Sequence, residues 1–75
     1  MFEWKTLFQV EIGIRLVRVE KGGGNVLRLT TATPDMEDPA RVRAPSPGIL
    51  KEKMIRRCFF SEEEADEITQ RIMKS

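Results

Sequence analysis

Apolar and polar residues alternate near the start of the chain, and this pattern limits the fold more than any other feature. Between the alternating positions lie mainly charged and polar residues, and only Leu7 clearly breaks that polar set. The alternating positions are Phe2, Trp4, Thr6, Phe8, Val10, Ile12, Ile14 and Leu16. Because successive side chains of a β-strand point to opposite faces, a period of two predicts β-structure with one buried face.

The alternation changes phase at Leu16 and Val17, which are adjacent and both apolar. A single straight strand from residue 2 to 20 would be about 60 Å long, well beyond the usual length of a strand. A phase change of one residue is typical of a β-bulge, and Gly13 is a place where the chain can bend. We therefore expect either two strands or one strongly curved strand.

The segment from Lys21 to Asn25 contains three consecutive glycines and predicts a tight turn, since glycine and asparagine tolerate positive φ. A return strand should follow from Val26 to Ala32, giving a β-hairpin. Its alternation places Leu27, Leu29 and Thr31 on one face and Arg28 and Thr30 on the other. The triple glycine lacks the lysine and hydroxyl residue that end a phosphate-binding P-loop, so a hairpin turn is the better interpretation.

Residues 33–48 hold all four prolines and predict a long, proline-rich loop, within which 41–43 can add a short edge strand. Residues 49–60 fit two patterns. Ser46 and Pro47 suit a helix start, and Leu50, Met54 and Cys58 share a helical face. The apolar block 58–60 favours a strand instead, and we expect a strand over 53–60.

The C-terminal segment 61–74 predicts a helix. Ser61 and Glu64 form the sequence signature of a capping box, and Ala65, Ile68 and Ile72 form an apolar stripe. Together these elements predict an α+β fold over residues 1–75 as a single domain. We expect a small antiparallel sheet of three or four strands, with one glycine-turn hairpin, packed against a single C-terminal helix.

Length and cysteine content favour an intracellular protein that binds partners. A chain of 75 residues buries only about 60–65% of its unfolded surface, so its core is thin. Cys58 is the only cysteine, which argues against a disulfide-stabilised secreted domain. No apolar run resembles a secretory signal or a membrane span. We expect a cytoplasmic protein with no membrane contact.

The residue types needed for catalysis are scarce. The chain has no histidine and no tyrosine, which removes the commonest general base and an additional acid–base group. A zinc site built on thiolates needs several cysteines. We therefore expect no enzymatic activity, no catalytic residues, no cofactor and no metal ligands. Cys58 is expected to be a buried apolar residue rather than a reactive thiol.

Positive charge is concentrated between residues 41 and 57, where Glu52 is the only acid. Residues 1–57 carry 11 Lys/Arg and 7 Asp/Glu, a net +4, whereas 58–75 carry 2 and 5, a net −3. The candidate partner-binding residues are Arg28, Arg41, Arg43, Lys51, Lys53, Arg56 and Arg57. The total of +1 is low for a dedicated nucleic-acid binder.

Two hypotheses follow. The first is a small regulatory or adaptor protein that acts by protein–protein contact, with homodimerisation through an open sheet edge as one variant. The alternative is a nucleic-acid-binding module that uses the 41–57 stretch and an exposed sheet face. The aromatic residues at 2–8 and 59–60 lie on the apolar phase of their segments, so we expect them in the core. Two or more aromatic side chains exposed beside Arg28 or Arg56 would instead favour nucleic acid.

Overall fold

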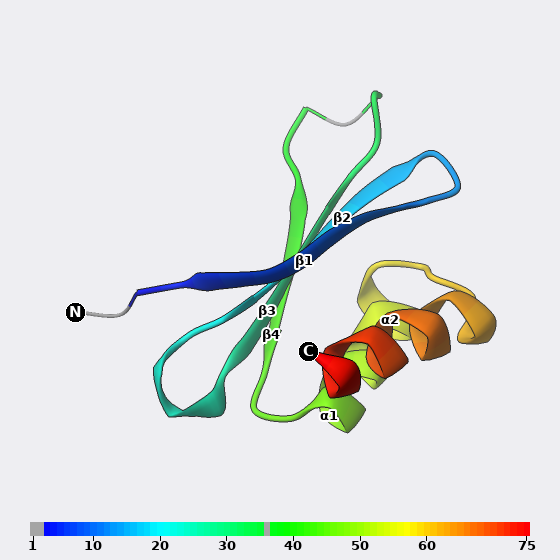
Figure 1. Ribbon diagram of the computed structural model, residues 1–75. Coiled ribbons are helices and arrows are strands. Elements are labelled where there is room, and N and C mark those ends of the chain that lie inside the picture. The colour runs from blue at the N-terminus through cyan, green and yellow to red at the C-terminus, as the bar shows by residue number, and fades with distance from the viewer. Residues whose placement is uncertain (1–2, 36) are drawn as a thin grey trace.

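The computed structural model describes residues 3–35 and 37–75; Phe2 of the alternation and Met36 of the predicted loop lie outside them. Its elements are β1 (Lys5–Ile12), β2 (Arg15–Lys21), η1 (Gly23–Asn25), β3 (Leu27–Ala32), β4 (Ala40–Ala44), α1 (Pro47–Arg57) and α2 (Glu62–Lys74). The strands form an antiparallel sheet in the order β1-β2-β3-β4. Figure 1 shows α1 and α2 together on one side of this twisted sheet. The predicted α+β class is confirmed.

Tight turns join the first three strands. Gly13 has a φ of 64° between β1 and β2, a conformation that glycine adopts without steric cost. Gly24 and Asn25 also have positive φ, at 71° and 65°, and the Gly22 amide donates to the Val26 carbonyl at 2.8 Å. The predicted glycine hairpin is therefore confirmed, and the long alternating segment is two strands.

A β-bulge lies in β1 rather than at Leu16. Thr6 pairs with Glu20, whereas Phe8 already pairs with Val19, so Leu7 is the extra residue. The extra residue of a bulge shifts the alternation of side chains by one position. Thr6 and Phe8, two positions apart, therefore point to opposite sides of the sheet instead of the same side. The phase change at Leu16 comes from the turn at Gly13 and not from a bulge in β2, whose pairing is regular.

Part of the predicted proline-rich loop is ordered as strand β4. Thr31 pairs with Ala40 and Leu27 with Ala44, which makes β4 an edge of the sheet. Val42 is buried while Arg41 and Arg43 are exposed, as an alternating strand requires. The short strand expected at 41–43 is confirmed and extends by one residue at each end.

The strand expected over 53–60 is wrong, because these residues belong mainly to α1. Ser46 caps the helix by accepting a hydrogen bond from the Ile49 amide at 3.4 Å, and Pro47 occupies the first turn. Leu50 and Met54 lie on one helical face and are fully buried. The apolar block 58–60 is not a strand, since Cys58 caps the helix and Phe59 turns the chain towards α2. The molecule thus has two helices rather than a single C-terminal helix.

The C-terminal helix has the predicted cap. The Glu64 amide donates to Ser61 Oγ at 3.1 Å, and the Ser61 amide donates to Glu64 Oε1 at 2.9 Å. These reciprocal bonds are the capping box, and Phe60 and Ala65 on either side of it are buried. The apolar stripe of the helix points into the core through Ile68 and Ile72.

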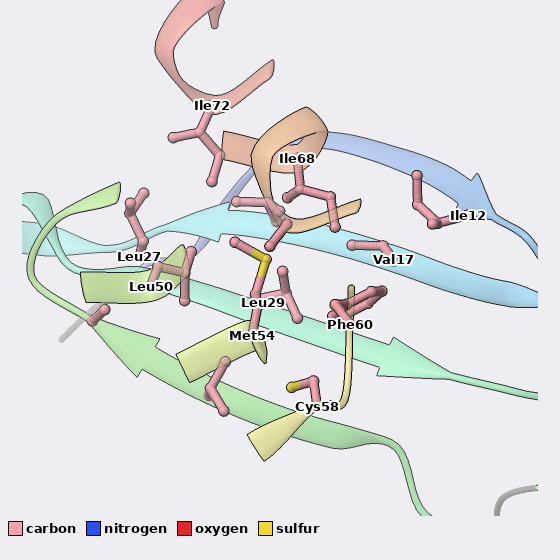
Figure 2. Packing of buried hydrophobic residues seen from close by; sticks show 14 residues of the cluster. Ile12, Val17, Leu27, Leu29, Leu50, Met54, Cys58, Phe60, Ile68 and Ile72 are labelled. Atoms are coloured by element: carbon pink, nitrogen blue, oxygen red, sulfur yellow. The ribbon is translucent and has the colours of Figure 1, made fainter. Parts of the chain in front are cut away.

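The core lies between the helices and one face of the sheet (Figure 2). Its fully buried large side chains are Leu29, Leu50, Met54, Ile68, Val17 and Val19. Burying a side chain of this size contributes about 1.5–3 kcal/mol, so this small set carries much of the stability. Both helices pack on the face that carries Val17, Val19 and Leu29, which leaves the opposite face of the sheet uncovered.

Candidate binding surfaces

The uncovered face of the sheet carries four arginines on its three adjacent strands β2 to β4. Cross-strand register places Glu20, Arg28 and Arg43 in one row, and Arg18, Thr30 and Arg41 in the next. We call Arg18, Arg28, Arg41 and Arg43 the arginine face. Adjacent side chains in one row are about 5 Å apart, so Arg28 and Arg43 are direct neighbours, whereas Thr30 lies between Arg18 and Arg41.

Glu20 forms an ion pair with one of these arginines, Arg28. Its Oε1 atom accepts hydrogen bonds from Arg28 Nε at 3.0 Å and Arg28 Nη2 at 2.8 Å. The Glu20 side chain is only 9% exposed, so solvent screens this pair less than an ordinary surface ion pair. Among the described residues, Arg18, Arg41 and Arg43 form no ion pair.

Trp4 lies on this uncovered face and not in the core. The Arg28 guanidinium carbon is 4.1 Å from the centre of the Trp4 ring, and that of Arg43 is 5.7 Å away. A Cβ atom on Gly22 would come within 3.0 Å of the ring, so Trp4 packs closely on the backbone of the glycine turn. The expected core position of Trp4 is wrong, because the bulge at Leu7 moves Trp4 and Thr6 away from the face of Phe8.

The predicted basic stretch is divided between two layers of the molecule. Arg41 and Arg43 lie on the uncovered sheet face with Arg28, whereas Lys51, Lys53, Arg56 and Arg57 lie on α1. Most of these α1 side chains have local partners. Lys51 Nζ lies 3.3 Å from Asp66 on α2, Lys53 Nζ donates to the Arg43 carbonyl at 2.7 Å, and Arg56 pairs with Glu52 at 3.3 Å.

Arg18 was missing from the predicted site although its signal is in the sequence. It follows Val17 and precedes Val19, both fully buried, and therefore has to point to the opposite face. The pairing of β2 with β3, and of β3 with β4, then brings Arg18 into the row of Arg41. Strand pairing of this kind cannot be read from a run of charges.

The second surface is apolar and lies at the tip of the β1–β2 hairpin and the link between the helices. Ile14 is 76% exposed and Phe59 is 80% exposed, whereas Leu16, 42% exposed, lies on the uncovered face in phase with Arg18. We call Ile14 and Phe59 the hairpin end. The expected burial of Phe59 is wrong, while Phe60 is buried as expected. Two surface hollows of about 460 and 220 Å³ adjoin these residues and share Arg15 and Thr33 in their walls.

Arg15 joins the two segments of the hairpin end. Its Nη1 atom donates to the Cys58 carbonyl, and its Nη2 atom donates to the Phe59 carbonyl at 3.2 Å. The Arg15 guanidinium also lies 4.5 Å from the centre of the Phe60 ring. These contacts hold the link between the helices against β2, so the exposed Phe59 side chain extends from a fixed backbone.

Two ionisable groups near Arg15 have shifted pKa values. Burial raises the pKa of the Cys58 thiol, and the nearby charge of Arg15 only partly opposes that shift. The thiol is therefore a poor nucleophile at neutral pH, as expected from the sequence. The hydrogen bond from the Ser61 amide lowers the pKa of Glu64, with a further contribution from the charge of Arg15.

Within residues 3–35 and 37–75, no three His, Cys, Asp or Glu side chains gather as a metal-ligand group. The same part of the chain contains no helix with the length and apolar character needed to cross a bilayer. No protein-family model, curated protein or solved structure matches this chain.

Proposed function

We propose that this chain is a small, non-enzymatic regulatory or adaptor protein that acts by binding another protein through the hairpin end. The observation that carries the proposal is the conformation of Phe59. A large aromatic side chain is 80% exposed on a residue whose φ is 59°. The exposure of the ring is unfavourable for the isolated chain, and a partner that covers the ring accounts for it, whereas the backbone conformation is imposed by contacts within the chain.

The backbone of Phe59 is strained. A non-glycine residue in the left-handed region costs about 1–2 kcal/mol, because its Cβ approaches the following carbonyl oxygen. Strain of this kind persists only where surrounding contacts impose it, and it concentrates at functional sites. Here the contacts are the backbone hydrogen bond from the Phe60 amide to the Met54 carbonyl at 3.2 Å, which closes the end of α1, and the hydrogen bonds from Arg15 to the Cys58 and Phe59 carbonyls.

A fixed backbone makes Phe59 suitable as an interface anchor. Hot spots of protein interfaces are large side chains, often aromatic, that bind with little loss of conformational entropy. Ile14 adds a second exposed apolar side chain on the β1–β2 hairpin, next to Arg15, which bonds to the link that carries Phe59. Exposed Arg57 and Glu62 flank the link and supply the polar rim that such interfaces have.

The partner that fits this surface presents an apolar pocket for Phe59 and charged groups around it. A second copy of the chain is one such partner, since Arg57 and Glu62 flank the link that carries Phe59 and give this region charges of both signs. Pairing through the free edge of β1 is a second route to a homodimer. A cytoplasmic location suits the single, buried Cys58.

Affinity capture with matched variants tests the proposal. Phe59→Ala removes the anchor, and Met73→Ala removes an apolar side chain that is 74% exposed on α2, far along the chain from the hairpin end. We expect a partner retained by the wild type and by Met73→Ala to be lost with Phe59→Ala. The purified pair should then show at least a tenfold weaker Kd for Phe59→Ala, since a hot-spot side chain contributes about 2 kcal/mol or more. Equal retention by both variants would contradict the proposal.

A further inference from the structure

The arginine face has a charge arrangement that the isolated chain does not need. Arg28 on β3 lies directly opposite Arg43 on β4, and like charges in this position destabilise a sheet. Strand β3 presents Thr30 and Ala32 elsewhere on the same face, so the sheet tolerates uncharged residues there. The cross-strand pairing of two arginines therefore points to a ligand that supplies negative charge.

Within residues 3–35 and 37–75, a carboxylate pairs with only one of the four arginines. Glu20 binds Arg28 through both Nε and Nη2, while Arg18, Arg41 and Arg43 have no carboxylate within ion-pair distance among the described residues. Arg18, Arg41 and Arg43 are also exposed. Three guanidinium groups on an uncovered face are thus available to an anion.

The spacing of these groups exceeds the size of one anion. Arg18 on β2 and Arg41 on β4 lie two strand spacings apart, about 10 Å, with Thr30 between them. The row of Arg28 and Arg43 runs beside them. A single phosphate can contact one or two guanidinium groups at once. The four arginines therefore fit a polymer with several anionic groups better than a single anion.

Planar side chains at one end of the arginine face indicate which kind of anionic polymer fits it. The Trp4 ring and the Arg28 guanidinium are stacked at 4.1 Å, beside the exposed Arg43. Aromatic rings and guanidinium planes are the groups on which unpaired bases stack, and the planar fork of arginine matches phosphate oxygens. Unpaired bases are accessible in a single strand and not in a duplex.

We propose that the arginine face binds the phosphate backbone of single-stranded nucleic acid. Arg18, Arg41 and Arg43 contact successive phosphates, and a base stacks on the exposed guanidinium of Arg43 at the Trp4 end, since the Trp4 ring itself packs against Gly22 and Arg28. This site is independent of the hairpin end, and it differs from the basic stretch 41–57 because it includes Arg18 and excludes the basic residues of α1.

Fluorescence anisotropy with a labelled 12-nucleotide single strand of mixed sequence tests this site. We expect micromolar or tighter binding at about 20 mM salt, with affinity that falls steeply as salt rises, because each phosphate contact releases counterions. The Trp4 fluorescence should change on binding, since its ring contacts Arg28 and Arg43.

Two double variants with the same change in net charge distinguish binding at the arginine face from a general effect of positive charge. Arg41→Gln with Arg43→Gln removes two exposed charges from the arginine face, and Arg56→Gln with Arg57→Gln removes two exposed charges from α1. We expect the first to weaken binding at least tenfold and to reduce the salt slope by about 1.4, and the second to weaken it less than threefold. Circular dichroism and thermal melts check that both variants fold.

The proposal is overturned by no binding at 20 mM salt, by equal losses in the two double variants, or by equal affinity for a poly-glutamate chain of matched length. The last result would assign the face to acidic proteins. Tighter binding of a 12-base-pair duplex than of the single strand would reject the stacking role of the Trp4 end and with it the proposed ligand.

Discussion

The Arg15 guanidinium donates to the carbonyl oxygen of Phe59 at 3.2 Å, across 44 positions of the chain. The same group donates to the Cys58 carbonyl and lies over the Phe60 ring, so one side chain organises the link between α1 and α2. Phe59 is consequently exposed without a mobile backbone. This relationship underlies the proposed function.

Replacing Arg15 with alanine should destabilise the fold and release Phe59. Hydrogen bonds from a charged donor contribute about 1.5–3 kcal/mol, and partial exposure of Arg15 reduces that figure, so we expect a loss of about 1–2 kcal/mol in urea unfolding. Arg57→Ala is the control, since Arg57 is exposed on the neighbouring helix turn. If both variants unfold at the same urea concentration as the wild type, Arg15 does not hold the link.

The strain at Phe59 predicts an order of stability between two truncations. Phe59→Gly and Phe59→Ala both remove the ring, but only glycine adopts a φ of 59° without a steric cost. We expect the glycine variant to be more stable than the alanine variant by about 1 kcal/mol in chemical unfolding, despite its greater backbone entropy in the unfolded state. An alanine variant that is equally stable or more stable would show that the backbone is not strained.

Thr31 offers a site where an apolar substitution should stabilise the protein. Its hydroxyl oxygen is buried and has no hydrogen-bond partner among the described residues. Because an unsatisfied buried polar group costs about 1–3 kcal/mol, Thr31→Val should raise the free energy of unfolding by about 1 kcal/mol. Thr31→Ser keeps the hydroxyl and loses a methyl group, and should therefore be less stable than the wild type. A less stable valine variant would mean that the hydroxyl is satisfied in solution.

Cys58 should give the protein a specific weakness at alkaline pH. Burial raises the pKa of the folded thiol above that of the unfolded chain, so the folded state binds more protons once the unfolded thiol ionises. The stability associated with the protonated thiol is present at neutral pH and falls as pH rises through the range in which ordinary thiols ionise. The wild type should lose more stability than Cys58→Ala between about pH 7 and 10. Equal losses of stability in the wild type and in Cys58→Ala would show that folding does not raise the pKa of the thiol.

The sequence predicted those elements whose signals are local. The capping box at Ser61 and Glu64 and the glycine turn after Lys21 involve residues only a few positions apart, and both formed as expected. The helix α1 also had a local signal in Ser46 and Pro47, but the adjacent apolar residues 58–60 suggested a strand. In the fold those three residues have different roles, as helix cap, exposed link and buried residue before α2.

The binding surfaces depend on relationships that are not local. Trp4 and Phe8 lie on the same phase of the sequence, and only the bulge at Leu7 sends them to opposite faces. Arg18 and Arg41 become neighbours of Thr30 through strand pairing, and the lysines and arginines of α1 move to the other layer when residues 47–57 form a helix. A count of charges along residues 41–57 therefore included the basic residues of α1, which do not lie on the arginine face, and missed Arg18, which does.

Site-specific photo-crosslinking tests the central claim, that the hairpin end binds a protein, most directly. The photoreactive analogue p-benzoylphenylalanine replaces Phe59 in one sample and Met73 in the other, both exposed apolar side chains. In lysate of the protein's own cells, we predict a discrete cross-linked species from position 59 and none of the same mass from position 73; a species of twice the monomer mass in the purified protein would identify a second copy as the partner. No discrete species from position 59, or the same pattern from both positions, would contradict the account.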